Sequence, residues 1–332
     1  MMATRTQPPP TSIHEAGPLR LLTWPVLGAD AAVTARDGGV SSGPYAALNL
    51  SLSVGDDPEN VLENRRRLAA AFGTAPGDYV FARQVHGASV RVVGEPDRGS
   101  GAFTLDDAIP DADALVTSTP GLVLAILTAD CVPIVLHDPV AGVLACVHAG
   151  WRGTVARVAA AAVAAMQTLG SRPADVIAGL GPAMAPDRYQ VGPDVRQAIT
   201  QSFAPAAAPD RYQAGSTAAA DPHQAGPHAH HAVARASGPA VRSDLYPETG
   251  QHRPDPSAPA FLRPDPGDRR GGRWLLDLWA ANRSVLQEAG VPAAQIHVTD
   301  IPTGPAGHDT FFSDRAARPC GRLALVAKLG TT

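Results

Sequence analysis

Three apolar runs that follow one another closely constrain the fold of this chain more than any other feature. They occupy residues 122–127, 132–136 and 143–148. Each has the length of a strand and is apolar almost throughout instead of alternating, which is typical of strands buried on both faces. Polar residues interrupt the stretch long before it could span a bilayer. The runs therefore predict a soluble, layered α/β protein with no membrane partner.

Further strand-like runs and four helical segments extend this pattern. The other expected strands are Tyr79–Val85, Ser89–Val93, Ala114–Thr117, Val176–Leu180, Ile296–Thr299 and Arg322–Lys328. The expected helices run from Asp57 to Phe72, Thr154 to Leu169, Asp194 to Phe203 and Asp277 to Ala289. The first of them has Pro58 in its first turn and Gly73 after its end, which are typical start and stop signals. Together they predict an α/β (α+β) domain whose mixed sheets are covered by helices.

The 332 residues, 45% of them apolar, are enough for one large domain. Residues 1–18 contain three consecutive prolines and are expected to be a flexible tail. A single catalytic domain is expected over 19–330. Within it, residues 204–273 are rich in Pro, Ala, Gly and His and show no sustained period. We interpret that segment as a low-complexity, disordered insertion.

Charge and cysteine content exclude several classes of function. A formal net charge of −4 does not favour a nucleic acid as partner, because binding one usually needs a basic face. Three cysteines do not form a disulfide framework. The N-terminal segment lacks the apolar core of a secretory signal. We therefore expect a cytoplasmic protein, in which a Cys near His residues is more often catalytic or metal-binding than bridged.

A possible metal ligand lies where each of three expected strands meets a turn. These ligands are His86, Cys131 and His148. Two imidazoles and one thiolate suit Zn²⁺, and three protein ligands leave a fourth position open for water or substrate. Their wide spacing is weak evidence alone. His86 could instead cap a strand, Cys131 could be a small buried hydrophobe, and His148 could pack against the glycine turn that follows it.

An anion site is a second possibility beside His148. The segment 149–154 leads from a strand into a helix and contains two glycines and Arg152. Free backbone N–H groups and a guanidinium there could bind phosphate, although the segment has no Walker A pattern and could be an ordinary capped turn. Arg36 and Arg315 lie in two other loops that could contribute cations. The alternative for each is a surface salt bridge with a neighbouring aspartate.

Taken together, these segments resemble the YfiH family of purine nucleoside phosphorylases, formerly described as laccase-like multicopper polyphenol oxidases. The resemblance covers most of residues 30–200 and 274–328. Its elements occur in the family's order. They are Thr34–Ser41, Leu48–Leu50, Gly55–Val61, Gln84–Gly87, Asp113–Val116, Thr128–Ile134, Val147–Gly153, Gly179–Ala183, Leu276–Leu278 and Phe311–Ser313.

The resemblance implies a four-layer α/β/β/α fold with mixed sheets, related to the catalytic domain of cytotoxic necrotizing factor. It implies that His86, Cys131 and His148 are metal ligands and catalytic residues. The metal would be Zn²⁺, with copper possible from the older family description. The implied activity is phosphorolysis of adenosine, inosine, guanosine and S-methyl-5′-thioadenosine, together with deamination of adenosine. Purine nucleosides and phosphate are thus the expected partners.

Four residues in or near the matching segments are predicted to bind substrate. They are Arg36, Asn49, Arg152 and Arg315. Asp130, next to Cys131, could orient a ligand or shuttle a proton, or it could bond local backbone amides. The sequence departs from the family's pattern at Asp314, where an aromatic residue or histidine is common.

Three other functions stay open at this stage. Cys131 activated by His148 would make a cysteine-nucleophile hydrolase. A copper-dependent polyphenol oxidase would need several His-x-His pairs, and His228-Ala229-His230 is the only one in the sequence. A zinc-stabilised binding module without turnover would lose its fold when the metal is removed.

Overall fold

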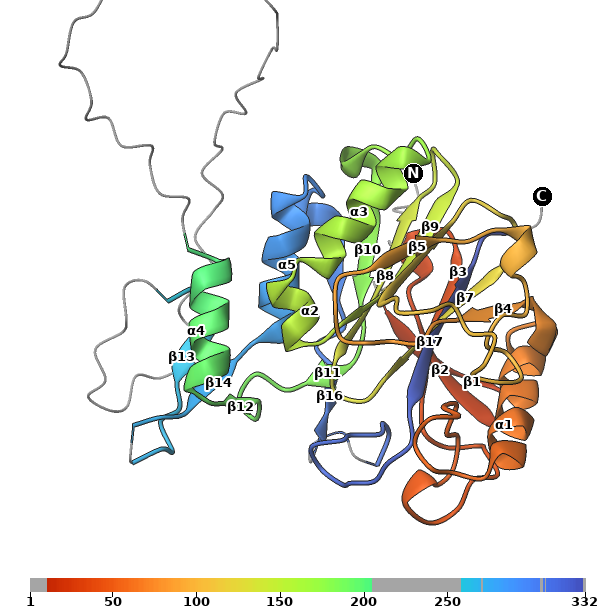
Figure 1. Cartoon of the computed structure of the whole chain (residues 1–332), viewed down its shortest axis with the longest axis horizontal. Helices are drawn as coiled ribbons and strands as arrows, with labels where there is room; N and C mark the ends of the chain where they lie inside the picture. The colour runs from red at the N-terminus through yellow and green to blue at the C-terminus, as the bar shows by residue number, and fades with distance from the viewer. Residues whose placement is uncertain (1–10, 205–257, 270, 305–306, 308, 331–332) are drawn as a thin grey trace, which may run out of the picture.

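Two six-stranded mixed sheets form the centre of the molecule (Figure 1). The computed structural model describes residues 11–204, 258–269, 271–304, 307 and 309–330. The first sheet has, in spatial order, the strands β1 (Ser12–Ala16), β2 (Leu19–Thr23), β3 (Asp30–Thr34), β17 (Leu323–Lys328), β7 (Val123–Thr128) and β4 (Tyr79–Phe81). The second has β15 (Ile296–Val298), β10 (Ile177–Leu180), β8 (Val132–Asp138), β9 (Val143–Ala149), β6 (Ala114–Thr117) and β5 (Val90–Val92).

The central strands are apolar on both faces because successive side chains point into two different cores. On β7, Leu124 and Ile126 join the core between the two sheets, whereas Val123 packs toward the outer face of the first sheet. On β9, Leu144 faces the core between the sheets and Ala145 belongs to the core on the outer face of the second. Each sheet is therefore buried on both sides, as the continuous apolar runs predict.

Helices cover the two outer faces (Figure 1). Helix α1 (Pro58–Ala71) packs on the first sheet, where Leu68 and Ala69 meet that outer core. Helices α3 (Val158–Thr168) and α5 (Leu278–Glu288) cover the second sheet. The layers are thus α/β/β/α, which confirms the predicted fold class.

One expected helix is two helices. The segment from Thr154 to Leu169 contains the end of α2 (Trp151–Val155) and all of α3, which are separated at Arg157. Arg157 has φ 63°, a left-handed conformation that breaks the helical path. Helix α2 therefore starts three residues earlier than expected, directly after His148 and its glycine turn, which places its first turn at the site.

Smaller elements complete the fold. Helix α4 (Pro193–Ser202) is followed by the segment 205–257, which lies outside the described residues. The remaining strands are β11 (Ala183–Met184), β16 (Pro302–Thr303), β12 (Gln190–Val191), β13 (Leu262–Pro264) and β14 (Trp274–Leu276). Short 3₁₀ turns lie at Pro25–Leu27, Gly43–Tyr45, Pro76–Asp78, Glu95–Asp97, Pro173–Asp175 and Ala293–Gln295.

Two stretches expected to be irregular contain strands. Ser12–Ala16 pairs antiparallel with Leu19–Thr23, so regular structure begins before Leu19. Leu262–Pro264, inside the expected insertion, pairs with β14. None of the three cysteines forms a disulfide. Among the described residues, no helix is long and apolar enough to cross a membrane.

Candidate metal centre and substrate pocket

Strand pairing between β8 and β9 brings two of the predicted ligands together. Val132 is paired with Ala149, so Cys131, just before β8, lies opposite Gly150, just after β9. His148 comes directly before Ala149 on β9 and is buried. Because the loop from β7 to β8 crosses from the first sheet to the second, Cys131 lies where the two sheets meet.

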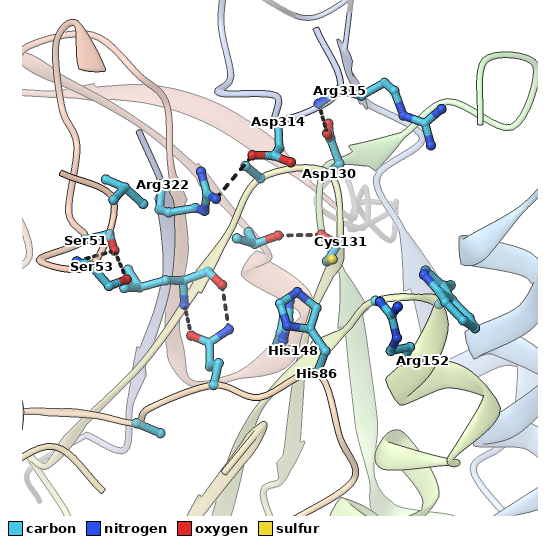
Figure 2. A pocket seen from close by; sticks show the side chains of 18 of the residues that line it. Ser51, Ser53, His86, Asp130, Cys131, His148, Arg152, Asp314, Arg315 and Arg322 are labelled. Atoms are coloured by element: carbon cyan, nitrogen blue, oxygen red, sulfur yellow. Dashed lines mark hydrogen bonds and ion pairs between the residues drawn. The ribbon is translucent and has the colours of Figure 1, made fainter. Parts of the chain in front are cut away.

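The third predicted ligand comes from the loop that follows β4. His86 has φ 61°, and its ring meets the ring of His148 edge-on with 4.7 Å between centroids. His86, Cys131 and His148 each offer one ligand atom, and these three atoms lie within 4.8 Å of one another. In Figure 2 these side chains converge on one point of the pocket. This donor set therefore fits a metal ion after small side-chain adjustments.

A buried carboxylate fixes both histidines. Asp113 precedes β6, whose pairing with β9 places it opposite His148. Its Oδ1 lies 2.8 Å from Nδ1 of His148 and accepts from the amide of His86 at 2.9 Å, while Oδ2 accepts from the amide of Gly87 at 2.6 Å. With Nδ1 engaged, Nε2 is the ring nitrogen of His148 left for a ligand.

Electrostatics in the metal-free centre favour an ion pair between Cys131 and His148. Burial opposes ionisation of Cys131, but His148 and His86 outweigh it and lower the pKa of the thiol to about 6. Burial likewise opposes protonation of His148, but Cys131 and Asp113 raise its pKa to about 9. Burial works against the ionised form of Asp113, yet its hydrogen bonds from His148 and the two amides keep its pKa below the ordinary value. The metal-free centre therefore holds a thiolate paired with a protonated His148, and a divalent metal bound there would replace that proton.

The loops around the centre are tied by side chains that bond to backbone. Gln84 both donates to the carbonyl of Leu127 at 2.7 Å and accepts from its amide at 2.8 Å, joining the His86 loop to the end of β7. Thr128 donates to the carbonyl of Cys131 at 2.6 Å. A Cβ on Gly150 would lie 2.8 Å from Sγ of Cys131, so this position accepts only glycine without movement of the thiol.

A pocket of about 600 Å³ opens above the three ligands (Figure 2). Five arginines and two aspartates contribute to its wall, an excess of positive charge in a chain whose net charge is −4. They are Arg83, Arg152, Arg315, Arg318, Arg322, Asp130 and Asp314. The volume is in the range of small-molecule sites, and the charge favours an anionic ligand.

The predicted substrate-binding residues fall into two groups. Arg152 and Arg315 line the pocket. Arg36 does not: its guanidinium donates to the carbonyl of Ala46 and lies over the ring of Phe312. Asn49 also lies outside the lining and is fully buried.

Asn49 acts on the pocket through its neighbours. It accepts from the amides of Ser51 at 3.1 Å and Arg322 at 2.9 Å, and both of these residues line the pocket. It also donates to the carboxylate of Asp56. Asn49 therefore shapes the wall without facing the cavity.

Asp130 serves as a tether between distant segments. It has φ 82°, and its carboxylate accepts from the Thr303 hydroxyl at 2.6 Å and from the amide of Arg315 at 2.8 Å. Both partners lie far away in sequence, so these contacts are not those of a local turn. The tether holds the loop beside Cys131 against the segment that carries Arg315.

Sequence reasoning misses several residues of this site. Asp113 stands out in the sequence only as part of a matching segment, and a lone aspartate before a strand has no spacing that predicts its role. Arg318 and Arg322 both pair with Asp314, and this pair of contacts forms one wall of the pocket. An Arg-x-x-x-Arg spacing after Asp314 is the available signal.

The chain is thus an α/β/β/α protein with four layers. Two histidines and a cysteine form a candidate metal centre where its two sheets meet, inside a cationic pocket. A family model described as multi-copper polyphenol oxidoreductase laccase matches residues 30–228 and 223–330. The chain belongs to this family.

Relatives and solved structures agree with the assignment. Purine nucleoside phosphorylase YlmD of Geobacillus stearothermophilus is 41% identical over 303 residues, covering 91% of this chain and 90% of YlmD. A purine nucleoside phosphorylase of Deinococcus radiodurans is 48% identical over 177 residues, which is 53% of this chain and 65% of the relative.

The crystal structure of YlmD matches with a TM-score of 0.75 at 32% identity, over 96% of this chain and 98% of that one. The hypothetical protein YfiH of Bacillus licheniformis matches with a TM-score of 0.74 at 29% identity, over the same shares of the two chains.

Proposed function

We propose that this chain is a zinc-dependent purine nucleoside phosphorylase. The observation that carries the proposal is the cationic pocket directly above His86, Cys131 and His148. The names of its relatives support the same reaction. Its proposed substrates are adenosine, inosine, guanosine and S-methyl-5′-thioadenosine.

The reaction breaks the bond between the purine and C1′ of the ribose. An oxygen of phosphate forms the new bond at C1′, and the purine leaves with the bonding electron pair and takes up a proton. The products are the free base and the sugar 1-phosphate, which is ribose 1-phosphate for the three ordinary nucleosides and 5-methylthioribose 1-phosphate for S-methyl-5′-thioadenosine. The protein must therefore bind an anion beside a neutral nucleoside and exclude water as a competing nucleophile.

Arg152 is the proposed phosphate ligand. It lies at the start of α2, shortly after His148 in sequence, and its guanidinium stacks on Trp151 at 4.4 Å. Among the described residues it has no carboxylate partner, whereas Arg318 and Arg322 pair with Asp314. Its charge is therefore available to a ligand.

Zinc is the proposed metal because two imidazoles, one thiolate and an open position form a catalytic zinc set. When bound, Zn²⁺ would supply a Lewis acid at the floor of the pocket. A multi-copper cluster would need more ligands. Within the described parts of the chain, His86, Cys131 and His148 form the single group of three or more His, Cys, Asp or Glu residues that could hold a metal.

Product analysis tests the phosphorylase proposal. Zinc-loaded protein is incubated with adenosine, with and without phosphate, and the products are separated by chromatography. We expect adenine only when phosphate is present, with loss of activity in His86→Ala and His148→Ala. Arg152→Ala should raise the KM for phosphate, while Arg188→Ala, whose residue does not line the pocket, should not. No product from any of the four nucleosides would contradict the proposal.

Adenosine deamination is a second activity proposed for the same pocket. The open position beside three protein ligands favours it, because water could bind there. The same incubation distinguishes the reactions, since deamination yields inosine without any need for phosphate. Absence of inosine under both conditions would exclude it.

A cysteine nucleophile is the competing interpretation of the same residues. The proximity of Cys131 to His148, which Asp113 orients, gives the nucleophile, base and orienting carboxylate that such chemistry needs. This alternative would be favoured if the metal-free protein retained turnover and lost it when iodoacetamide labelled Cys131. Turnover that depends on zinc would contradict it.

A further inference from the structure

One carboxylate contacts both histidines of the candidate metal centre. Asp113 is fully buried, and its two oxygens accept from His148 Nδ1 and from the amides of His86 and Gly87, all within 2.9 Å. The amide of Val85 adds a longer contact of 3.3 Å. These contacts join a loop after β4 in the first sheet to β9 in the second.

The contact with His148 selects the form of its ring. A carboxylate accepts hydrogen bonds and cannot donate one while ionised, so Nδ1 of His148 must carry the proton. The amide of His148 also donates to the carbonyl of Asp113 at 2.7 Å, which fixes the backbone of the same residue. In the neutral ring, the lone pair is then on Nε2.

The contacts with the His86 loop hold an unfavourable backbone conformation. A left-handed φ of 61° at a residue other than glycine costs roughly 1 kcal/mol or more and needs support from its surroundings. Two consecutive amides that converge on one carboxylate provide it. His86 itself is exposed, so packing on its side chain contributes little.

We propose that Asp113 is the positioning residue of the metal centre: it sets the tautomer of His148 and the backbone of His86, so that both rings are in place before a metal binds. The inference rests on the proposed zinc centre and is independent of the nucleoside that the pocket accepts. It assigns Asp113 no contact with substrate.

Zinc affinity measured by competition with a chelator tests the proposal. In Asp113→Asn the side-chain NH₂ cannot accept from the loop amides, so we expect zinc to bind about 10–100-fold more weakly than in the wild type. Asp138→Asn is the matched control. Asp138 is also fully buried and accepts from the amides of Val140, Ala141 and Arg172, but it does not line the pocket.

A second measurement needs no variant and remains decisive if Asp113→Asn does not fold. Long-range ¹H–¹⁵N correlation spectra of zinc-loaded wild-type protein with labelled histidines report which ring nitrogen of His148 carries the proton. We expect a proton on Nδ1 and metal on Nε2. A merely structural role for Asp113 would set no such preference.

The outcomes separate the inference from the proposed function. Zinc affinity in Asp113→Asn within threefold of that in Asp138→Asn, or metal on Nδ1 of His148, would overturn the inference alone. A wild-type chain that takes up no zinc would overturn the metal centre and the inference together. Zinc binding as expected in a protein that turns over no nucleoside would leave the inference standing and remove the phosphorylase.

Discussion

Gly150 leaves no room for a side chain beside Cys131 and His86. The Cβ of alanine there would lie 2.8 Å from Sγ of Cys131 and 3.5 Å from Cδ2 of His86, so the thiol must move. We expect Gly150→Ala to weaken zinc binding about tenfold or more, as displaced ligands do. Gly77→Ala is the control, because nothing lies within 4 Å of its added Cβ. Equal zinc affinities in the two variants, measured by chelator competition, would contradict the expectation.

Asp314 neutralises part of the positive pocket wall. Its carboxylate pairs with Arg318 and with Arg322, where an external anion could otherwise bind. We expect Asp314→Asn to lower the KM for phosphate several-fold at low salt, with the gain declining as ionic strength rises. Asp187→Asn, which breaks an exposed pair with Arg188 outside the pocket lining, should leave the KM unchanged. A higher KM in Asp314→Asn would instead show that the carboxylate aligns the arginines.

At the residue scale, the sequence indicates the three candidate ligands but not the residues that hold them in place. Residue chemistry makes His86, Cys131 and His148 candidate ligands, the family resemblance selects them as one set, and the structure places them side by side. Arg36 looks available for substrate in the sequence because no nearby residue reveals its bonds to the Ala46 carbonyl. Asp113 could not be assigned, because its role depends on the register between β6 and β9, which no local pattern encodes.

At the scale of elements, α1 is anchored by a buried cation. Arg65 donates to the carbonyls of Leu50, Gly101 and Ala102 and lies over the ring of Phe81 at 3.9 Å. Replacing it with methionine would leave these acceptors buried without a donor. We expect Arg65→Met to lower the free energy of unfolding by about 3–5 kcal/mol in denaturant titrations.

Arg66→Met is the matched control for α1. Its side chain is 60% exposed and pairs with Glu63 within the helix, so we expect a change below about 0.5 kcal/mol. A similar loss in both variants would mean that helix propensity, and not the buried hydrogen bonds, determines the result.

The elements that the sequence predicts well are the strands that are buried on both faces. The prediction for β6 is correct to the residue, and those for β7, β8 and β9 to within two, because continuous apolar runs are unmistakable. β11 and β16 have two residues each and no pattern to detect. The break between α2 and α3 escapes prediction because Arg157 is an ordinary helix-forming residue, and its guanidinium bonds to the Ser202 carbonyl, which is far away in sequence.

At the scale of the whole molecule, the extent of the apolar core predicts a fold that survives loss of the metal. Three apolar clusters hold the four layers together, and the ligands lie at loops and strand ends. Free zinc at a hundred times its Kd would add about 2.7 kcal/mol. We therefore expect a chelator to lower the Tm by several degrees in calorimetry while the cooperative transition remains. Loss of the transition would instead support a zinc-stabilised binding module.

The position of β17 has a consequence for the order in which the molecule can be assembled. β17 comes after every other strand in sequence, yet it lies between β3 and β7 in the first sheet. While the chain is being synthesised, β3 and β7 therefore expose unpaired edges until residues 323–328 leave the ribosome. The pocket, whose walls include the segment just before β17, can be completed only at that moment.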